Sequence, residues 1–208
     1  MVRRTKEAAL ETRHSILDAA ETVFHEKGVA KASLAEIATV AGVTRGAVYW
    51  HFANKADLFE AMIQRIFGSM EGKIAELQAQ KHENPIDFLR ELVLYFIDCV
   101  ANDPHYYRLV EISWHKCEYV GEMARIRDKH LECGNRFLKL YEETFQRASA
   151  SSLLLPDIAP RTAAVGLMAV LDGLVTNWTL DKSAFSLSKI GPQIINRYLA
   201  NCCRQART

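Results

Sequence analysis

The side chains best suited to recognising another molecule lie within residues 38–55. Arg45 can donate two hydrogen bonds to a guanine base, and Gly46 beside it permits close approach. Three further polar side chains of this stretch are Thr44, Tyr49 and His51. The hydroxyl groups among them suit the phosphate oxygens of a nucleic-acid backbone. The stretch contains two basic residues and no acidic residue, and it predicts contact with the major groove of DNA.

Two short helices joined by a glycine turn must position these side chains. Ser33 and the glutamate three residues later form a capping box, in which each satisfies a backbone N–H group of the first helix. Gly42 supplies the turn, and Thr44 is a natural N-cap for the second helix. The spacing over residues 33–52 is that of a helix-turn-helix motif. Other pairs of capped helices share this spacing, so the pattern favours DNA binding without establishing it.

Helical spacing of apolar residues continues along almost the whole chain, and no stretch alternates as a strand would. Prolines at helix starts and glycines at helix ends divide the pattern. We expect an all-α chain with helices near residues 10–27, 33–41, 44–51, 54–80, 85–101, 104–115, 121–149, 160–180 and 187–204. The pair Gly191-Pro192 leaves two alternatives for the last helix, which either kinks at the proline or begins near it.

The charge of the whole chain is close to neutral. Lys and Arg number 26 against 25 Asp and Glu, which leaves a formal net charge of +1. Residues 1–60 hold eight basic and eight acidic residues, although residues 1–6 have three bases and no acid. The neutral total excludes a generally adhesive polycation. Local basic stretches, doubled in a dimer, still permit a specific DNA-binding surface.

The composition is that of a soluble globular chain. The 208 residues are 49% hydrophobic and 25% charged, which suits one or two domains with a sizeable core. Five cysteines, an odd number, favour a reducing compartment. We see no signal peptide, and the longest apolar run, residues 163–171, is shorter than the roughly 20 residues that cross a bilayer. We therefore expect a cytoplasmic protein that does not span a membrane.

The sequence carries no motif that would indicate an enzyme. It lacks G-x-S-x-G, a glycine-rich phosphate loop and H-E-x-x-H, so hydrolase, nucleotide-binding and zinc-protease functions have no support. His115 with Cys117, and His130 with Cys133, offer only two potential ligands each, whereas a zinc site needs three or four. We expect no catalytic site, no metal and no cofactor.

A resemblance to a known family begins in the second helix of the motif. The sequence TRGAVYWHF at residues 44–52, with Asn54, Lys55 and Leu58 after it, is similar to the recognition helix of the TetR family of bacterial repressors. Other segments resemble the AcrR-type subgroup, which represses multidrug efflux operons: RRTKE at 3–7, WHKCEYVGEM at 114–123, Asp172-Gly173-Leu174 and Trp178. The match is close over about the first 60 residues.

The resemblance implies a nine-helix fold that forms a homodimer through its last two helices. Three N-terminal helices within residues 1–55 would bind DNA, and residues 56–208 would bind ligand and dimerise. Because two recognition helices in such a dimer lie about one DNA turn apart, the expected partner is a pseudo-palindromic operator in double-stranded DNA.

The resemblance also implies roles for single residues of the DNA-binding domain. Base contacts are expected from Arg45 and Gly46. Phosphate contacts are expected from Ser33, Thr44, Tyr49, His51 and Lys55. Arg3, Arg4 and Lys6 would extend the surface along the backbone or into a minor groove. For the aromatic residues we expect Phe52, and Trp50 with it, to pack the small core and Tyr49 to face outward, while His51 stays open between the two.

For the C-terminal domain the resemblance implies a cavity that holds bulky apolar compounds. The candidate lining residues are Ile66, Phe67, Met70, Leu92, Phe96, Val110, Trp114, Phe137, Tyr141, Met168, Leu171, Asp172 and Val175. Residue types alone do not separate such a cavity from an ordinary core, which aromatic and methionine side chains also fill. Some relatives carry polar residues where this chain has Val110 and Trp114, so we expect a more apolar pocket than is usual for the subgroup.

Asp172 is the most informative polar residue of this set. It stands among apolar neighbours, and a buried carboxylate must be paired, hydrated or protonated. Three roles stay open: it anchors a cationic or hydroxyl-bearing ligand, bridges two subunits, or bonds a neighbouring helix end.

Gly68 and Gly72 in the fourth helix each cost about 1 kcal/mol relative to alanine. They either pack a close neighbour, leave room for ligand or let the helix flex.

Together these patterns predict a ligand-responsive transcriptional repressor that controls a multidrug efflux pump and hence antibiotic resistance. Hydrophobic or cationic compounds would release it from its operator. One alternative is a regulator of the same family that controls another pathway, such as lipid or aromatic metabolism. Another is a helical small-molecule carrier whose helix-turn-helix no longer binds DNA.

Overall fold

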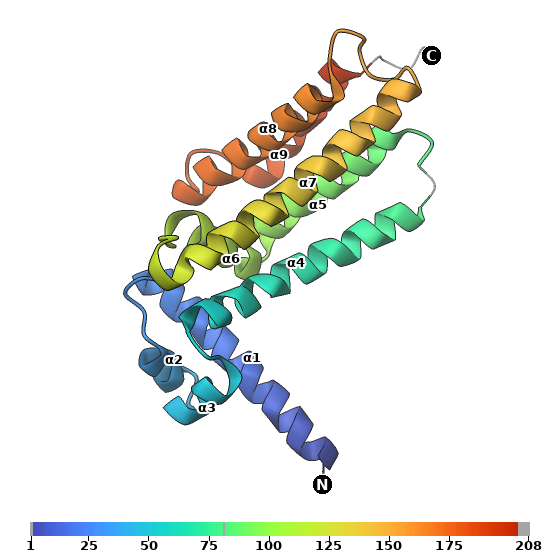
Figure 1. Ribbon diagram of the computed structural model, residues 1–208. Helices are drawn as coiled ribbons and strands as arrows, with labels where there is room; N and C mark the ends of the chain where they lie inside the picture. Colours follow the sequence, from blue (N-terminus) through green and yellow to red (C-terminus); the bar gives the residue numbers. More distant parts are fainter. Residues whose placement is uncertain (1, 81, 204–208) are drawn as a thin grey trace. The chain divides into compact units, whose positions relative to one another are not determined.

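Helices build the chain from end to end. The computed structural model describes residues 2–80 and 82–203, and at residues 2–5, 66 and 67 it describes the backbone alone. Within these ranges there are nine α-helices, one short 3₁₀ helix and no strand (Figure 1), so the all-α prediction is confirmed. The elements are α1 (Val2–Lys27), α2 (Leu34–Val40), α3 (Arg45–His51), α4 (Lys55–Ala79), α5 (Pro85–Asn102), α6 (Pro104–His115), η1 (Gly121–Met123), α7 (Ala124–Ala150), α8 (Pro160–Leu180) and α9 (Leu187–Cys202).

Packing divides the chain into two compact units. Unit 1 comprises residues 1–68 and 108–129, and unit 2 comprises residues 69–107 and 130–208. Helices α4, α6 and α7 therefore each contribute to both units. The functional boundary expected near residue 55 stays a prediction, because compact packing does not by itself assign DNA and ligand binding.

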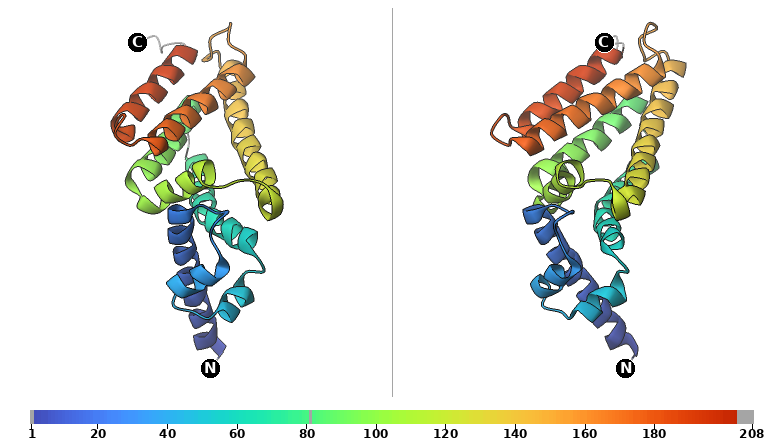
Figure 2. Two further views of the ribbon diagram at one scale, coloured as in Figure 1. Left: turned by 90° about the vertical axis from the view of Figure 1, so that its left-hand side faces the viewer. Right: turned by 60° about the vertical axis from the view of Figure 1, so that its left-hand side comes forward.

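The core of unit 1 forms around α1, in which apolar residues recur every three or four positions. Ile16, Ala20 and Phe24 are fully buried, and the ring centroids of Phe24 and Phe59 of α4 lie 6.1 Å apart. Helices α2 and α3 both pack against α1 (Figure 2). The two short helices are thus held by one long helix.

Ion pairs join the segment 108–129 to the rest of unit 1. The guanidinium of Arg108 lies 3.1 Å from the carboxylate of Glu21, whose side chain is only 2% exposed. Arg125 pairs with Asp57 near the start of α4. Because a buried carboxylate is costly without a partner, the Arg108–Glu21 pair stabilises the contact between α6 and α1.

In unit 2, α9 packs against both α5 and α8. Two glycines permit this close contact. A Cβ atom at Gly166 of α8 would collide with the hydroxyl group of Tyr198, which donates a 2.8 Å hydrogen bond to the carbonyl of Ala163. A Cβ atom at Gly191 of α9 would lie 3.2 Å from the side chain of Ile97 of α5. A side chain at Gly166 would therefore force Tyr198 to move, whereas a methyl group at Gly191 would press on Ile97 only slightly.

One helix start differs from expectation, and the alternative start for the last helix is excluded. Helix α1 begins at Val2 rather than near Leu10, because residues without an apolar stripe still include good helix formers such as alanine, glutamate, lysine and arginine. Helix α9 begins at Leu187 and contains Pro192 in its interior, so a start near the proline is wrong. The missing N–H of the proline costs this helix one internal hydrogen bond.

Helix α8 is, among the described residues, the one helix long and apolar enough to cross a membrane. A core helix of a bundle has the same length and composition. Helix α8 packs against α5 and α9, and Leu167 and Val175 are fully buried. Contacts within unit 2 therefore account for part of its apolar character.

Candidate nucleic-acid interface and ligand site

The start of α2 is fixed by the expected capping box. The Ser33 hydroxyl accepts a 3.2 Å hydrogen bond from the backbone N–H of Glu36, and the Glu36 carboxylate accepts one of 3.0 Å from the backbone N–H of Ser33. Lys27 donates to the same carboxylate over 2.5 Å. These hydrogen bonds, first from Lys27 and then from Ser33, lower the pKa of Glu36. The box confirms the sequence prediction and leaves the phosphate role of Ser33 a prediction.

Helix α3 turns almost all of its side chains outward. Thr44 is its N-cap, since its hydroxyl accepts a 3.1 Å hydrogen bond from the backbone N–H of Ala47. Val48 is the buried residue of the helix, whereas Thr44, Arg45, Gly46 and Tyr49 are exposed. The structure thus brings these four predicted contact residues together on one accessible surface. Thr44 begins this surface and Tyr49 lies one turn along it.

Gly46 is not required by the fold. A Cβ atom at this position would lie 3.8 Å from the hydroxyl of Thr44, which is ordinary van der Waals contact, and its backbone is helical. Alanine would therefore fit and would favour the helix. A glycine at an exposed, dispensable position supports the proposal that another molecule approaches the backbone here.

Trp50 is exposed, and the expectation that it packs the core is wrong. Its exposed fraction is 74%, against 2% for Phe52, whose burial is confirmed. Val48 and Phe52 are four positions apart and face the core together, whereas Trp50 is two positions from each and points roughly 160–200° away. Trp50 is therefore a candidate contact residue that the sequence reasoning missed. The signal was present in this spacing.

His51 lies half-buried at the end of α3, next to Trp50 and α1. The His51 and Trp50 ring centroids are 4.5 Å apart, with the rings nearly perpendicular. Burial, and then the charge of Arg13, lower the pKa of His51. Arg13 itself lies 5.1 Å from the centroid of the Phe52 ring. This arginine of α1 brings a positive charge to α3 that the sequence reasoning did not assign.

Lys55 stabilises unit 1 from within. Its ammonium donates hydrogen bonds of 3.1 Å to the carbonyls of Ala30 and Ala32, in the loop between α1 and α2. Its side chain is 15% exposed and lies 3.9 Å from the Glu122 carboxylate. A phosphate contact from Lys55 stays a prediction beside this structural role.

The basic residues at the start of the chain are only partly described. Lys6 is exposed. The side chains of Arg3 and Arg4 lie outside the described residues, so their predicted contacts are not placed. Lys6 is thus the one member of this group whose accessibility to a DNA backbone is supported.

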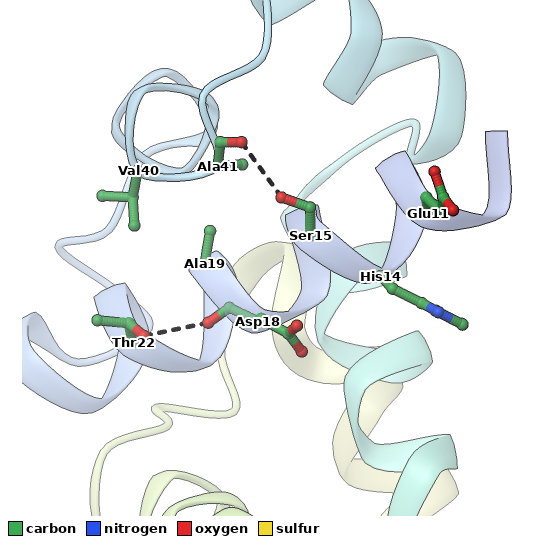
Figure 3. Close-up of a pocket in the computed structure, with 8 residues that line it drawn as sticks. All are labelled: Glu11, His14, Ser15, Asp18, Ala19, Thr22, Val40 and Ala41. Atoms are coloured by element: carbon green, nitrogen blue, oxygen red, sulfur yellow. Dashed lines mark hydrogen bonds between the residues drawn. The ribbon is translucent and has the colours of Figure 1, made fainter. Parts of the chain in front are cut away.

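A groove of about 530 Å³ lies between α1 and the end of α2 (Figure 3). Glu11, His14 and Asp18 line it from α1, with Val40 of α2 opposite. The Asp18 carboxylate is held by Arg65 of α4 at 2.5 Å. Because carboxylates repel phosphate groups, we assign this groove no part in DNA contact.

The predicted ligand residues divide between the two units. Those in unit 2 are Met70, Leu92, Phe96, Phe137, Tyr141, Met168, Leu171, Asp172 and Val175. Val110 and Trp114 belong to unit 1, and the side chains of Ile66 and Phe67 lie outside the described residues. Within unit 2, Leu92 and Val175 are fully buried, as core residues are. A cavity lined by this set stays a prediction.

Asp172 combines solvent access with a desolvating environment. The residue is exposed on α8, and the three roles left open for it stay predictions. Surrounding protein nevertheless raises the pKa of Asp172, with burial as the cause. The pKa of buried Tyr141 on α7 is also raised, first by burial and then by the charge of Asp172. An accessible, partly desolvated carboxylate near a tyrosine suits contact with a cationic or hydroxyl-bearing molecule.

Gly68 and Gly72 of α4 are both exposed. A Cβ atom at either position would meet no atom within 4 Å. The interpretation that these glycines allow close packing of a neighbour is therefore wrong. Room for ligand and flexibility of the helix are the two interpretations that stay.

The described residues give no support for a metal centre or for a reactive cysteine. Among residues 2–80 and 82–203, no three His, Cys, Asp or Glu side chains come together as metal ligands do. Burial raises the pKa of Cys117 and of Cys203 to about 11. Both thiols therefore stay protonated near neutral pH and are poor nucleophiles.

The comparisons with known proteins agree with this geometry. Residues 16–62 match the model of the family described as bacterial regulatory proteins, tetR family. Residues 84–202 match the model described as MAATS-type transcriptional repressor, C-terminal region. The first match contains α2, α3 and the start of α4, and the second contains α5 to α9.

Individual proteins match over most of the chain. The transcriptional regulator AcrR of Shigella flexneri is 37% identical over 91% of this chain and 88% of its own length. TtgR of Pseudomonas putida is 36% identical over 86% of each. Among solved structures, NalD, the secondary repressor of the MexAB-OprM multidrug efflux pump in Pseudomonas aeruginosa, has a TM-score of 0.86 at 32% identity and covers 96% of this chain and 99% of its own. A complex of SmeT with triclosan has a TM-score of 0.84 at 27% identity, over 94% of this chain and 93% of its own.

Proposed function

This chain belongs to the TetR family of bacterial regulatory proteins, and we propose that it is a ligand-responsive repressor that controls a multidrug efflux pump. Similar proteins include a repressor of such a pump, NalD, and family members are transcriptional regulators rather than enzymes. The observation that carries the proposal is the surface of α3, where Arg45, Gly46 and Tyr49 are exposed together. A regulator that acts on operator DNA works in the cytoplasm.

The exposed face of α3 would enter the major groove. Arg45 at its start pairs with a guanine, while Gly46 lets the helix backbone come close to the bases. Thr44, Tyr49 and His51 reach the flanking phosphates. Trp50 adds an apolar surface suited to thymine methyl groups. Ser33, Lys55 and the basic residues at 3, 4 and 6 extend the contact along the backbone.

A homodimer through α8 and α9 would place two such faces on one operator. Val165 of α8 is 46% exposed, and Ile190 and Ile194, one turn apart on α9, are 37% and 39% exposed. Exposed apolar side chains on two adjacent helices suit burial against a second copy. We expect Ile194→Asp to yield monomers in sedimentation experiments. A dimer that persists in this variant with unchanged affinity would argue against this interface.

Ligand would bind among the apolar residues of unit 2, with Asp172 as its polar contact. The aromatic and aliphatic side chains there suit a bulky hydrophobic compound, and the carboxylate suits an added positive charge or hydroxyl group. The complex of the similar repressor SmeT with triclosan supports an apolar ligand of this size. Ligands therefore belong to the class of hydrophobic or cationic drug-like molecules.

Release of the operator requires only modest coupling between the two sites. A ligand that favours misplaced recognition helices by about 1.4 to 2.8 kcal/mol weakens operator binding roughly tenfold to a hundredfold. The same factor must apply in reverse, because binding free energies are reciprocal.

A gel shift with the DNA upstream of the protein's own gene and its divergent neighbour tests the proposal at a stated salt concentration. We expect a specific shift that triclosan or the cationic dye crystal violet reverses. A specific shift that neither compound reverses, together with regulation of a lipid or aromatic pathway gene, would reassign the target pathway. Ligand binding without any specific shift would indicate a carrier.

A further inference from the structure

Two acidic residues follow directly behind the exposed surface of α3. Residues 38–55 contain no acid, but Asp57 and Glu60 lie in the first two turns of α4. The Asp57 carboxylate accepts a 3.2 Å hydrogen bond from the backbone N–H of Ala53. Because Ala53 is only two residues beyond His51, the last residue of α3, this carboxylate lies within roughly 10 Å of the end of that helix.

A carboxylate in this place opposes DNA binding. Charges in solution act on one another over about 10 Å at about 0.1 M salt. A phosphate group at the end of α3 would therefore be repelled by Asp57, and like charges facing each other across an interface lower both the association rate and the affinity. A surface that binds DNA here needs a positive charge beside this carboxylate.

Arg125 of α7 supplies that charge from 68 positions further along the chain. Its guanidinium pairs with the Asp57 carboxylate and donates a 3.0 Å hydrogen bond to the side-chain oxygen of Asn54. The same oxygen of Asn54 accepts a 2.9 Å hydrogen bond from the backbone N–H of Asp57. Arg125 thus lies against both side chains that shape the start of α4.

Lys129 repeats this arrangement one helical turn later. It lies one turn beyond Arg125 on α7 and pairs with Glu60, which lies about one turn beyond Asp57 on α4. All four side chains belong to unit 1. Their exposed fractions lie between 30% and 52%, and ion pairs this accessible contribute little to the stability of a fold. Their larger effect is on the charge that unit 1 presents behind α3.

The same segment also brings a negative charge to α4. The Glu122 carboxylate lies 3.9 Å from the ammonium of Lys55, the first residue of α4, and its side chain is 50% exposed. Glu122 therefore offsets a positive charge at the helix start, whereas Arg125 offsets a negative one. These two residues should act on DNA binding with opposite sign.

We propose that Arg125 is a positioning residue for DNA binding, which holds and neutralises the Asp57 carboxylate so that the surface of α3 meets phosphate groups without repulsion. Lys129 does the same for Glu60. This shielding requires no contact between α7 and DNA. It rests on the proposed function, because the two carboxylates matter in this way only if α3 binds DNA.

Fluorescence anisotropy on the full-length protein, with labelled DNA from upstream of its own gene, tests the shielding. Arg125→Gln removes the guanidinium charge and leaves the Asp57 charge unpaired. We expect the affinity to fall about eightfold at about 0.1 M salt and about threefold at about 0.3 M, as for the loss of one neutralised phosphate. The melting temperature should stay nearly unchanged, since the pair is exposed.

A second substitution separates shielding from direct contact. Asp57→Asn removes the negative charge and keeps a side-chain oxygen for the Ala53 N–H group. In this background Arg125→Gln should no longer weaken binding. A loss that persists there would mean that Arg125 contacts phosphate itself, and it would overturn the shielding. Arg125→Lys keeps the charge and should retain most of the affinity.

Two further variants test the sign and the place of the charge. Glu122→Gln should strengthen binding, because it removes the acid beside Lys55. Arg127→Gln is the matched control: Arg127 is 59% exposed in the same turn of α7 and lies 3.3 Å from its neighbour Asp128 instead of reaching α4. It should weaken binding much less than Arg125→Gln. Equal losses would assign the effect to net charge and contradict the shielding.

The natural protein distinguishes this inference from the proposed function. Specific binding that Arg125→Gln leaves unchanged would overturn the shielding alone. No specific binding by the natural protein would refute the proposed function, and the shielding with it.

Discussion

In the proposed function, the α3 surface and the α7–α8 region of unit 2 would bind their partners with different kinds of side chain. On α3 one residue, Val48, is buried and the contact groups face solvent. The α7–α8 region holds six candidate contact residues, of which three are buried, two are half-buried and Asp172 is exposed: Tyr141, Leu171 and Val175 are the buried ones, and Phe137 and Met168 the half-buried ones. If the proposal is right, DNA recognition by α3 is separable from folding, whereas ligand recognition by the α7–α8 region uses some side chains that also stabilise unit 2.

The largest expected effect is a loss of stability in unit 2, which would also weaken ligand binding. Leu92 is fully buried in α5, so Leu92→Ala should lower the free energy of unfolding by about 2–5 kcal/mol through lost burial and a cavity. Chemical denaturation measures this loss. The exposed Leu131→Ala is the matched control and should cost much less. Equal costs for the two variants would show that the stability of unit 2 does not depend on its buried residues.

Changes on α3 should act on DNA binding alone. Arg45→Ala should weaken operator binding by about 1–3 kcal/mol, the usual value of a bidentate base contact, and leave the melting temperature unchanged. Fluorescence anisotropy with labelled operator measures the first and calorimetry the second. Arg127→Ala removes an exposed arginine of unit 1 away from α3 and serves as the control. A large loss of stability in Arg45→Ala would contradict the separation of recognition from folding.

Asp172 is the one charged residue among the candidate ligand contacts of the α7–α8 region. Asp172→Asn should weaken binding of crystal violet about tenfold, a typical value for one lost ionic contact, and leave triclosan binding nearly unchanged. Since burial raises the pKa of Asp172, its ionised form opposes folding, and this cost appears as pH rises above the ordinary aspartate pKa of 3.8. The variant should therefore melt slightly higher at neutral pH and equal the natural protein below that pKa.

The smallest expected effect is a pH dependence of operator binding caused by His51 of α3. Burial and Arg13 lower the pKa of His51 in the free protein, and a DNA phosphate would raise it again by favouring the protonated ring. Operator affinity should then increase as pH falls from 7.5 to 5.5, by at most about tenfold for each pKa unit regained. His51→Gln should remove this dependence. A pH profile that survives this substitution would assign it to another group.

The two regions also differ in how far the sequence predicts them. Caps at Ser33 and Thr44 are local, since each depends on a backbone group three residues away, and both are confirmed. Trp50 was misplaced because its apolar character outweighed its spacing from Val48. The sequence does not distinguish a ligand pocket from an ordinary core, because both use large apolar side chains at helical spacing.

Contacts between residues far apart in the sequence could not be predicted from sequence patterns. The Arg108–Glu21 pair joins residues 87 positions apart, and no local pattern indicates which acid an arginine will meet. The open space beside Gly68 is likewise a property of what the surrounding helices leave empty. Helix caps were predictable because they depend on neighbours in sequence, and these features depend on neighbours in space.

The central claim is that the α3 surface and the ligand region are two coupled sites of one repressor. Isothermal titration of triclosan and crystal violet into the free protein, and into protein saturated with operator DNA, measures that coupling directly. For a compound that reverses the gel shift, operator should weaken binding by the same factor by which the compound weakens operator binding, roughly tenfold to a hundredfold. An equal affinity with and without operator would contradict the account.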